Sequence, residues 1–464
     1  MPERQFDIAV IGGGPGGYVA AIRASQLGFK VAVIERDRLG GICLNWGCIP
    51  TKALLKNAEI YQHFKHADEW GISCKDLKFD FSKIVERSRK VATLNSKGIE
   101  YLFKKNKIEH ILGFGKVLGN GKIEVSKDGK GIETVSAKHV IIATGGRPRT
   151  LPNVKIDGKQ VISYMEAMVL PELPKSMVII GAGAIGVEFA YFYNAFGSEV
   201  TLIEMMANIL PGEDKEISKL LESSFKKKDI EIFTEAKVES VATSKEVTVA
   251  VTMKEGKKQL KADVALMAIG IQGNIENMGL EAVGVKVEKG WIQVDDYGRT
   301  NVPGIYAIGD VAGPPWLAHV ASREGIVCVE AIAGKNPQPI DYENIPGCTY
   351  CQPQVASLGM TEERAIAEGR QIKVGRFPFS ASGKARAIGE TEGLVKLMFD
   401  AKYGELLGAH ILGSEATEMI AELGVAKSLE TTGSGIYGTI HAHPTLSEAI
   451  MEAAENAYGH AIHI

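Results

Sequence analysis

Hydrophobic positions near the N-terminus alternate between strand-like and helix-like patterns. The apolar run at 6–11 predicts a buried strand, and the stretch 18–27 predicts a helix after a glycine-rich turn. A second apolar run, 30–34, predicts another strand that ends at the acidic Glu35. A strand, a turn, a helix and a strand in this order are typical of a parallel α/β unit.

The same order of patterns recurs in the middle of the chain. Residues 177–180 predict a strand, a helical pattern follows, and 199–203 predict a second strand that ends at Glu204. Each series is completed by a further apolar strand and a glycine turn, at 140–145 and at 265–270. The repeat predicts two copies of one Rossmann-like α/β fold in a single chain.

Both turns have the spacing G-x-G-x-x-G, in which each glycine has a mechanical role in binding a dinucleotide. The first allows the sharp turn, the second lets a pyrophosphate approach the backbone, and the third lets the helix pack on the strand. The helix N-terminus then faces the phosphates, and an acid 23 positions after the first glycine accepts bonds from the ribose. The alternative is that each is only a glycine-rich turn of some other α/β fold, but this explanation would have to hold for both copies. The two sets are Gly12, Gly14, Gly17 and Glu35, and Gly181, Gly183, Gly186 and Glu204.

The residues after Glu204 indicate which nucleotide the second site prefers. Sites for NADP usually place an arginine near this strand end, where it meets the 2′-phosphate. Here residues 205–208 are Met-Met-Ala-Asn and carry no positive charge. Two dinucleotide sites imply two cofactors with hydride transfer between them, and we expect the second site to prefer NAD.

Cys43 and Cys48 stand in the segment LGGICLNWGCIPTK, within the first α/β series. In a regular helix, Cα atoms five positions apart are about 8–9 Å from each other, whereas a disulfide needs less than about 7 Å. The segment must therefore leave regular helix if the two thiols are to meet. A dithiol beside a dinucleotide could exchange two electrons with it, and two unrelated buried thiols are the alternative. The residues that permit a bend are Gly40, Gly41, Gly47 and Pro50.

Composition places the chain among ordinary globular proteins of several domains. It has 464 residues, of which 45% are apolar and 23% charged, and its net charge is −3. Because there is no basic surplus to neutralise phosphates, we expect no nucleic-acid partner. The longest apolar stretch, 178–197, is interrupted by Glu188 and by glycines, so we expect no membrane span.

The N-terminus and the remaining cysteines bear on localisation and chemistry. The segment 1–5, before the first apolar run, is short and polar, so we expect no signal peptide. We therefore expect a bacterial cytoplasmic protein, or an organelle-matrix protein whose transit peptide has been removed. Cys348 and Cys351 form C-x-x-C without a second ligand pair, so we predict buried packing and no metal site. Whether this pair has a redox role stays open. Cys74 and Cys328 are single and are expected to be structural.

Together these motifs resemble those of the flavin-dependent pyridine nucleotide–disulfide oxidoreductase family, over essentially the whole chain. Within the family, the chain is most similar to members that oxidise dihydrolipoamide. The remaining motifs are ATGGRP (143–148), TNVPGIYAIGDV (300–311), LAHVASREG (317–325) and HAHPTLSE (441–448).

The resemblance implies two Rossmann-like dinucleotide-binding domains and a C-terminal α+β dimerisation domain. The expected boundaries are 1–148 for the FAD-binding domain and 149–270 for the NAD-binding domain. Residues 271–345 would form a central domain that completes the FAD site, and 346–464 the dimerisation domain.

The resemblance assigns FAD to the first fingerprint and NAD to the second, and it adds residues to both sites. Asp310 is expected to hold the ribityl chain, although it could be only the acid of a turn at a strand end. The helical pattern at 317–333 would point its N-terminus at the flavin, with His319 in its first turn. A packing or capping role for this histidine is the alternative. Further cofactor-binding residues implied by the resemblance are Lys52, Gly115, Thr144, Gly145, Gly270 and Ala318.

The resemblance also pairs Lys52 with Glu188. A buried lysine needs such a partner, because an unpaired buried charge is costly. Its positive charge could also favour the Cys48 thiolate. A solvated surface lysine and an unrelated helical glutamate are the alternative interpretation.

The HAHPTLSE segment contains the catalytic base that the resemblance implies. His443 would take a proton from the dithiol substrate, and Glu448 would orient His443. The residues themselves also allow a simpler interpretation, in which Pro444 disfavours helix at His443 and 445–448 form a capping box that opens a helix. His441 is the less favoured base, because the family's histidine directly precedes proline.

The expected activity is oxidation of dihydrolipoamide, with exchange at Cys43 and electron transfer from Cys48 towards FAD and then NAD. The lipoyl group would come from a protein of a 2-oxo acid dehydrogenase or glycine cleavage complex. The family's base reaches the cysteines of the other subunit, so the resemblance implies a homodimer. Family members that reduce glutathione disulfide or mercuric ion, and a flavoprotein with only a docking role, are the alternatives.

Overall fold

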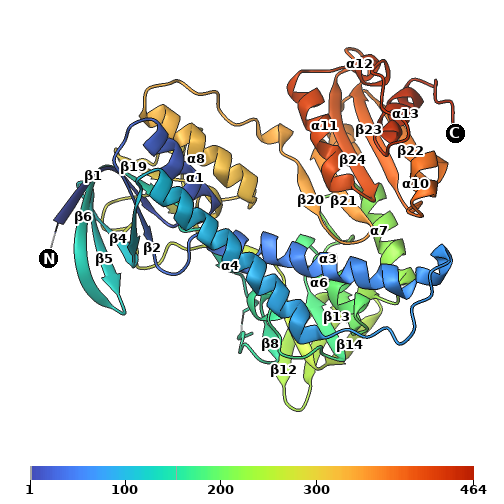
Figure 1. Ribbon diagram of the computed structural model, residues 1–464, viewed down its shortest axis with the longest axis horizontal. Helices are drawn as coiled ribbons and strands as arrows, with labels where there is room; N and C mark the ends of the chain where they lie inside the picture. The colour runs from blue at the N-terminus through green and yellow to red at the C-terminus, as the bar shows by residue number, and fades with distance from the viewer. Residues whose placement is uncertain (1–2, 153) are drawn as a thin grey trace. The chain divides into compact units, whose positions relative to one another are not determined.

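The computed structural model describes residues 3–152 and 154–464 (Figure 1). Met1, Pro2 and Asn153 lie outside the described residues. The chain forms two compact units and enters each of them three times. Unit 1 contains the chain up to Leu54 together with Asp80–Arg149 and Gly270–Ile340, and unit 2 contains Leu55–Phe79, Thr150–Ile269 and Asp341–Ile464.

A seven-stranded sheet forms the centre of unit 1. Its strand order is β3-β2-β1-β6-β5-β4, and β19 also pairs with β6. The pairs that involve β1, β2, β3 and β19 are parallel, whereas β4 and β5 are antiparallel additions. The strands are β1 (Glu3–Ile11), β2 (Val31–Glu35), β3 (Glu109–Leu112), β4 (Phe114–Gly119), β5 (Lys122–Lys127), β6 (Lys130–Ile142) and β19 (Ile305–Ala307).

Helices α1 and α8 pack closely in unit 1 because both carry glycine at the contact. A Cβ atom on Gly325 would lie 2.7 Å from the carbonyl oxygen of Gly16. Helix α3 begins in unit 1 and continues beyond the unit boundary at Leu54. The helical elements are α1 (Pro15–Gln26), α2 (Gly41–Trp46), α3 (Cys48–Lys65), α4 (Phe81–Lys105), η2 (Gly309–Val311) and α8 (Ala318–Ile332); the short strands are β7 (Gly146–Pro148), β16 (Ile271–Gly273), β17 (Val287–Glu288) and β18 (Trp291–Ile292).

Unit 2 contains a second parallel sheet, with the order β11-β10-β9-β15-β8, and a three-stranded antiparallel sheet. Helix α6, which follows β9, is apolar and buried along most of its length. These strands are β8 (Val161–Ile162), β9 (Ser176–Ile180), β10 (Glu199–Ile203), β11 (Glu231–Phe233), β12 (Lys237–Thr243), β13 (Val247–Met253), β14 (Gly256–Ala262) and β15 (Val264–Met267). The helices are η1 (Ala67–Trp70), α5 (Tyr164–Ala167), α6 (Ala184–Ala195) and α7 (Lys215–Lys227).

The C-terminal part of unit 2 is an antiparallel sheet, order β20-β21-β24-β23-β22, with helices α11, α12 and α13 beside it (Figure 1). Strands β23 and β24 are buried along nearly their whole length. The strands are β20 (Gly347–Thr349), β21 (Gln354–Gly359), β22 (Ile372–Pro378), β23 (Leu394–Asp400) and β24 (Leu406–Gly413). The helices are η3 (Tyr342–Asn344), α9 (Glu362–Ala367), η4 (Phe379–Ala381), α10 (Gly383–Ala387), α11 (Ala416–Ser428), α12 (Gly433–Tyr437) and α13 (Glu448–Ala457).

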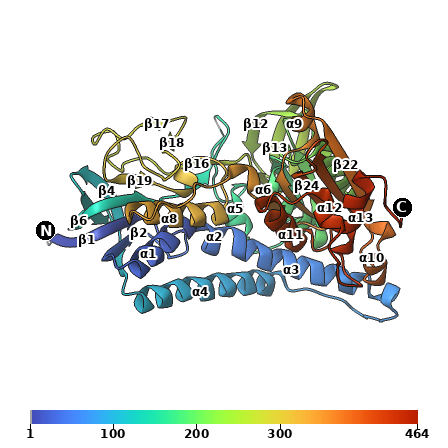
Figure 2. The ribbon, with the colours of Figure 1, turned by 90° about the horizontal axis from the view of Figure 1, so that it is seen from above.

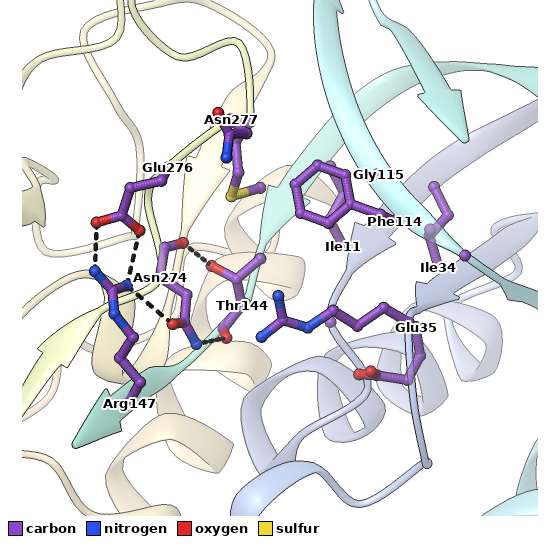
Figure 3. Close-up of a pocket in the computed structure, with 14 residues that line it drawn as sticks. Ile11, Ile34, Glu35, Phe114, Gly115, Thr144, Arg147, Asn274, Glu276 and Asn277 are labelled. Carbon is purple, nitrogen blue, oxygen red and sulfur yellow. Dashed lines mark hydrogen bonds and ion pairs between the residues drawn. The ribbon is translucent and has the colours of Figure 1, made fainter. Parts of the chain in front are cut away.

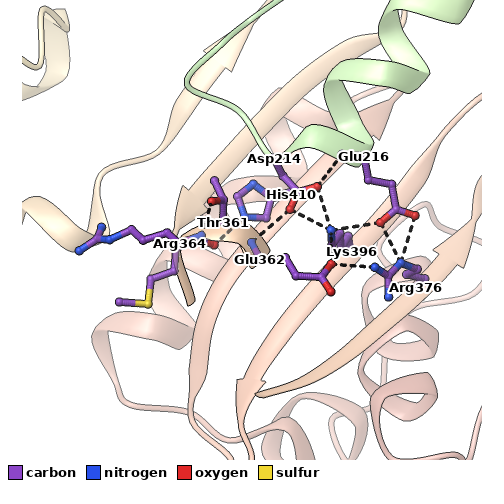
Figure 4. A network of polar contacts seen from close by, with 9 residues as sticks. Asp214, Glu216, Thr361, Glu362, Arg364, Arg376, Lys396 and His410 are labelled. Carbon is purple, nitrogen blue, oxygen red and sulfur yellow. Dashed lines mark hydrogen bonds and ion pairs between the residues drawn. The ribbon is translucent and has the colours of Figure 1, made fainter. Parts of the chain in front are cut away.

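A buried charge network joins α7 to this C-terminal sheet (Figure 4). Lys396 is only 1% exposed and its Nζ lies 2.8 Å from Asp214, 3.1 Å from Glu216 and 2.7 Å from Glu362. Arg376 also pairs with Glu216 and Glu362. Burial alone would lower the pKa of Lys396, but the neighbouring carboxylates have the larger effect, so the pKa is raised above its usual value. The network therefore fixes two parts of unit 2 to each other, and breaking it would leave buried charges uncompensated.

The predicted elements are present with shifts of a few residues at their ends. The helix predicted at 18–27 is α1, which begins earlier, at Pro15, because proline is tolerated in a first helical turn. The helix predicted at 317–333 is α8, with Leu317 and Ala333 as its flanking residues. Among the described residues, no helix combines the length and apolar character that crossing a membrane requires.

Candidate active site

The turn between β1 and α1 shows why glycine is required at its first and third fingerprint positions. Gly12 has φ +110°, and a Cβ atom there would lie 2.1 Å from the carbonyl oxygen of Ala143. A Cβ atom on Gly17 would lie 1.9 Å from the carbonyl oxygen of Gly12. Gly14 flanks the start of α1, and no side chain caps this helix. The first-turn N–H groups are therefore not satisfied by a side-chain cap and suit an anion.

Glu35 holds the loops on either side of it with both carboxylate oxygens. One oxygen accepts a bond of 2.7 Å from the N–H of Gly13, and the other a bond of 2.9 Å from the N–H of Asp37. Beside this turn is a cavity of about 410 Å³ (Figure 3). Its lining includes the predicted site residues Gly12, Glu35, Gly115 and Thr144.

The second fingerprint repeats this geometry in unit 2. Gly181 has φ +102°, and a Cβ atom there would lie 2.4 Å from the carbonyl oxygen of Ala268. A Cβ atom on Gly186 would lie 1.9 Å from the carbonyl oxygen of Gly181. Glu204 accepts bonds from the N–H groups of Ala182, at 2.8 Å, and of Met206, at 2.9 Å. Both turns are thus built for a backbone that passes close to a ligand.

The second glycine of each fingerprint tests whether a dinucleotide fits. A Cβ atom on Gly183 would meet nothing within 4 Å, and one on Gly14 would meet only Gly41, at 3.9 Å. The protein itself therefore does not need glycine there, whereas a pyrophosphate over an uncapped helix start does. Both sites fit a dinucleotide. Gly145, with φ +67°, and Gly270, with φ +102°, each lie three residues after the end of a strand, β6 and β15, whose following residues contact these turns.

The chain leaves regular helix between the two cysteines, as their spacing predicted. Helix α2 ends at Trp46, Gly47 has φ −142° and ψ −119°, and α3 begins at Cys48. A cysteine at a helix N-terminus is favoured as thiolate. Lys52 is in the same helix, one turn further on.

The pKa of the Cys43 thiol lies well above its usual range. The main cause is a hydrogen bond between the Cys43 and Cys48 side chains, followed by burial, while the positive charge of Lys52 opposes both. The Cys43 thiol therefore keeps its proton, with its side chain hydrogen-bonded to that of Cys48.

The remaining residues predicted for the first cofactor lie around η2 and the start of α8. Asp310 is half-buried in η2, where burial and the nearby Glu324 raise its pKa to about 6. Ala318 and His319 open α8, whose flanking Leu317 provides no side-chain cap. This helix start has the polarity that suits negative charge. Their contact with a flavin stays a prediction.

The predicted base and its carboxylate are hydrogen-bonded. His443 Nδ1 lies 2.9 Å from Glu448 Oε1, and the His443 side chain is 80% exposed. Burial opposes ionisation of Glu448, but the N–H of Thr445 and the His443 ring outweigh it, so the pKa of Glu448 is lowered. His441 is held differently, because its Nε2 lies 2.8 Å from Glu422 and its Nδ1 lies 2.9 Å from the Thr439 carbonyl oxygen.

The capping box predicted at 445–448 is only half present. Glu448 does accept a bond from the Thr445 N–H, but the Thr445 hydroxyl donates to the carbonyl oxygen of Ala442, at 2.8 Å. Helix α13 therefore begins at Glu448, and Ser447, which precedes it, makes no side-chain cap. The prediction was wrong because the hydroxyl stabilises the loop before the helix rather than the helix itself.

Glu188 lies where the sequence placed it, on the helix after the second fingerprint. It is 5% exposed in α6, and its Oε1 accepts a bond of 3.0 Å from the N–H of Tyr350. This backbone bond helps to compensate a buried carboxylate. The pairing of Glu188 with Lys52 stays a prediction.

The other cysteines differ in burial. Cys351 is fully buried, with its Sγ 3.1 Å from the Pro353 carbonyl oxygen, whereas Cys348 is half-buried on β20. Cys328 is fully buried in α8, as expected for a structural residue, but Cys74 is exposed, so burial does not explain it. Among the described residues, no group of three histidine, cysteine or acidic side chains is arranged to hold a metal ion.

Two family models match the chain. The model described as pyridine nucleotide-disulphide oxidoreductase matches residues 6–325, and the model of the dimerisation domain of these enzymes matches residues 345–454. The chain belongs to the pyridine nucleotide-disulphide oxidoreductase family. The family resemblance and the fold class predicted from the sequence are both confirmed.

Individual members of this family are similar to the chain over nearly its whole length. A dihydrolipoyl dehydrogenase of Rhizobium etli is 51% identical and covers 98% of both chains, and one of Zymomonas mobilis is 50% identical and covers 99% of both. Among solved structures, LpdA of Mycobacterium tuberculosis matches with a TM-score of 0.90 at 28% identity, covering 97% of this chain and 99% of its own. The flavoprotein disulfide reductase RclA of Escherichia coli has a TM-score of 0.88 at 27% identity, with the same coverage.

The partners of Thr144 in the wall of the first cavity were not predicted from the sequence (Figure 3). The Thr144 hydroxyl donates to the Asn274 carbonyl oxygen at 2.8 Å, and the Asn274 amide donates to the Thr144 carbonyl oxygen at 2.9 Å. Arg147 forms two bonds with Glu276 and also reaches Asn274. Arg147 is part of the ATGGRP motif, but its partners lie more than 120 positions away and no local pattern marks them.

Proposed function

We propose that the protein is an NAD-dependent dihydrolipoyl dehydrogenase, which oxidises dihydrolipoamide carried by a partner protein. The observation that carries the proposal is the pair Cys43 and Cys48, joined by a hydrogen bond at a helix break beside the first fingerprint. Relatives with this name match the whole chain at 45–51% identity. A two-electron dithiol beside a dinucleotide site is what this reaction needs.

The family uses FAD and NAD, and the two fingerprints provide one site for each. FAD would be held by the first set, with Gly12, Gly14, Gly17 and Glu35, and NAD by the second, with Gly181, Gly183, Gly186 and Glu204. The two cofactors supply the chemistry that moves an electron pair from a dithiol to a nicotinamide. Gly115, Thr144, Gly145, Asp310, Ala318, His319, Gly270 and Lys52 are proposed to line these sites. Thiol–disulfide exchange with the substrate and uptake of its proton are performed by the chain's own side chains.

In the oxidised protein, Cys43 and Cys48 would form a disulfide that the substrate opens. A substrate thiolate attacks the Cys43 sulfur, the bond between the cysteines breaks, and Cys48 leaves as a thiolate. The second substrate thiol then loses its proton and attacks the substrate sulfur of the mixed disulfide. Cyclic lipoamide is released, and Cys43 leaves and takes up a proton. The cysteines are reduced by two electrons and the substrate is oxidised by two.

His443 is the proposed acceptor of the substrate's proton. When its Nδ1–H donates to Glu448, the opposite ring nitrogen is left as the acceptor. The lowered pKa of Glu448 keeps the carboxylate charged, so that it stabilises the imidazolium after the proton arrives. Glu448 is thus proposed as a positioning residue rather than a proton carrier. Glu188 and Lys52 are proposed to form the charge pair near the thiols.

We further propose that the protein works as a homodimer through a dimerisation domain at 346–464, which follows the proposed domains 1–148, 149–270 and 271–345. Exposed apolar side chains in this C-terminal part support it: Val425 is 62%, Leu429 72% and Ile440 97% exposed in the single chain. A second copy would remove these surfaces from water. The lipoyl-bearing partner belongs to a 2-oxo acid dehydrogenase or glycine cleavage complex. Bacterial relatives support a bacterial cytoplasmic location.

The experiment that tests the function combines two inactive variants. Cys48→Ser and His443→Gln, produced alone, should each lose dihydrolipoamide-dependent NADH formation while keeping the flavin. Co-expressed with different tags and purified as a heterodimer, they should recover about half of the wild-type rate, because one of the two symmetric sites regains both groups. Retained turnover in the Cys48→Ser protein contradicts the dithiol role. An inactive heterodimer contradicts sharing of the site between subunits.

An NADP-dependent reductase of glutathione disulfide or mercuric ion is the second candidate on the same fold. The uncharged segment after Glu204 argues against it, because Met205 and Met206 are exposed and offer no charge to a 2′-phosphate. The same assay with NADP in place of NAD decides between them. Equal rates with both nucleotides would contradict the proposed preference for NAD.

A further inference from the structure

Helix α4 packs against the segment that carries the redox pair (Figure 2). The face of α4 that is buried has residues at 88, 92, 96, 99 and 103, a helical spacing. Ile99 and Phe103 belong to the same apolar cluster as Leu39 and Leu44, and Cys43 packs against that cluster. The motif segment therefore does not stand alone, and a helix outside the motif supports it.

Polar side chains of α4 bond to backbone oxygens on both sides of the cysteines. The Ser96 hydroxyl donates to the Leu39 carbonyl oxygen at 2.9 Å, before Cys43. The Ser88 hydroxyl donates to the Pro50 carbonyl oxygen at 2.9 Å, after Cys48. These two bonds fix the ends of the segment.

Arg89 acts between those two points, at the break itself. Its guanidinium donates to the carbonyl oxygen of Asn45 at 2.7 Å and lies over the Trp46 ring, 4.8 Å from the ring centre. Because α2 ends at Trp46 and the chain breaks at Gly47, the last carbonyl groups of α2 have no intrahelical N–H partner. A cation at this end also complements the helix dipole. Arg89 thus closes the C-terminal end of α2, two residues after Cys43.

We propose that Arg89 is a positioning residue for the redox pair: by holding Asn45 and Trp46 against α4, it keeps the Cys43 sulfur within reach of Cys48. Closing a disulfide depends on the effective concentration of one thiol at the other. Loosening the end of α2 lowers that concentration and leaves the separate thiols unchanged. Arg89 therefore stabilises the disulfide relative to the dithiol. The inference rests on the redox role given to the pair in the proposed function.

The test measures the disulfide equilibrium without using lipoamide. The holoenzyme is equilibrated anaerobically in buffers of dithiothreitol and its cyclic disulfide, quenched by alkylation, and analysed by mass. The two cysteines give up two protons and two electrons when they join, and the cyclic reagent takes these up as it opens to dithiothreitol. Because neither NAD nor lipoamide is present, failure of the proposed activity and failure of this inference are separate results.

Arg89→Ala should shift the equilibrium about tenfold towards the dithiol, which is about 30 mV for a two-electron couple. Lys90→Ala removes an exposed charge from the same helix and should leave the equilibrium unchanged. Arg89→Lys keeps the charge but loses the planar stacking and fork, so it should restore only part of the effect. Equal equilibria for Arg89→Ala, Lys90→Ala and wild type would overturn the proposal.

Trp46→Leu provides a second route if Arg89→Ala does not fold. It removes the ring under the guanidinium but leaves the bond to Asn45 available, so a shift of about threefold is expected. Bound flavin and circular dichroism confirm that each variant is folded before its equilibrium is compared. A folded Trp46→Leu protein with the wild-type equilibrium would overturn the part of the proposal that rests on stacking.

Discussion

The two glycine fingerprints of the chain have nearly the same backbone but different surroundings. Gly12 and Gly181 have φ values of +110° and +102°, and Gly14 and Gly183 have φ values of −70° and −71°. In both copies, the acid at the strand end accepts two backbone N–H bonds. The local motif therefore produces the same turn conformation and the same backbone bonds to the acid in both copies.

The difference lies in what packs on the turn. In both copies a later segment bonds to the turn, because Gly40 N–H donates to the Gly13 carbonyl oxygen at 2.8 Å and Leu210 N–H donates to the Ala182 carbonyl oxygen at 2.8 Å. In the first copy this segment also reaches the second glycine, since a Cβ atom on Gly41 would lie 2.7 Å from Gly14. The segment with the cysteines is thus folded directly onto the first fingerprint. In the second copy, a Cβ atom on Gly183 would find open space. The cysteine segment therefore covers the second glycine of the first turn, whereas the equivalent position of the second turn is open.

Substituting the first glycine of each copy should damage the two sites most, and in different ways. Gly12→Ala places a methyl group against Ala143 in a strained backbone, so we expect a protein without flavin and with little folded material. Gly181→Ala makes the equivalent clash with Ala268, and we expect the flavin to remain while NADH-dependent turnover is lost. Flavin absorbance and NADH oxidation measure the two effects. A Gly181→Ala protein that binds NADH normally would contradict the assignment of the second site.

The second glycines separate what the fold requires from what a bound dinucleotide requires, because the fold itself has room for a side chain at these positions. Gly14→Ala and Gly183→Ala keep an ordinary φ and have room for the methyl group, so the melting temperature of the cofactor-free protein should hardly change. Each methyl group nevertheless occupies the approach of a pyrophosphate, and we expect about 100-fold weaker binding of FAD or NADH, respectively. Affinities from flavin release and NADH fluorescence provide the measurement. Unchanged affinity in either variant would show that the phosphates lie elsewhere.

The sequence could predict the parts of the site that depend on near neighbours. Gly12, Gly17 and Glu35 were predictable because their roles follow from a turn and a strand end within one α/β unit. The break at Gly47 followed in the same way from the distance that two thiols must span. These residues carry their own geometric constraint, so one local pattern is enough to find them.

Interactions between distant parts of the chain were not predictable. Lys396 is buried against Asp214, 182 positions away, and nothing in the strand pattern of β23 marks a lysine as internal. Arg89 likewise reaches a carbonyl group 44 positions away, on a short helix. Where two local partners compete, the pattern is ambiguous: the Thr445 hydroxyl bonds to Ala442 and not to the helix that follows. Such choices depend on the folded surroundings.

Asp310, an acid proposed for the first site, should make a small, pH-dependent contribution to the free energy of unfolding. Burial and the nearby Glu324 raise the pKa of Asp310 to about 6 from its usual 3.8. The folded state thus favours the protonated acid, and this contribution to stability is present below pH 3.8 and is lost as the pH rises through about 6. Asp310→Asn keeps a neutral side chain at every pH and removes this dependence. Between pH 4 and pH 7, the flavin-free wild type should therefore lose about 1–2 kcal/mol relative to the variant, less than full burial would give.

Urea unfolding of the flavin-free proteins at several pH values measures this difference. Asp296→Asn removes an exposed acid of the same unit and should follow the wild-type profile. If Asp310→Asn also ran parallel to wild type, Asp310 would ionise as a solvated turn residue does, and its place in the first site would lose its support. A difference that develops between pH 4 and pH 7 and persists at higher pH would instead identify Asp310 as a buried acid, whose charge a polar ligand has to stabilise. Backbone N–H groups already bind the strand-end acid in both fingerprints, so Asp310 would then add a buried acid to the first site beyond what the shared motif provides.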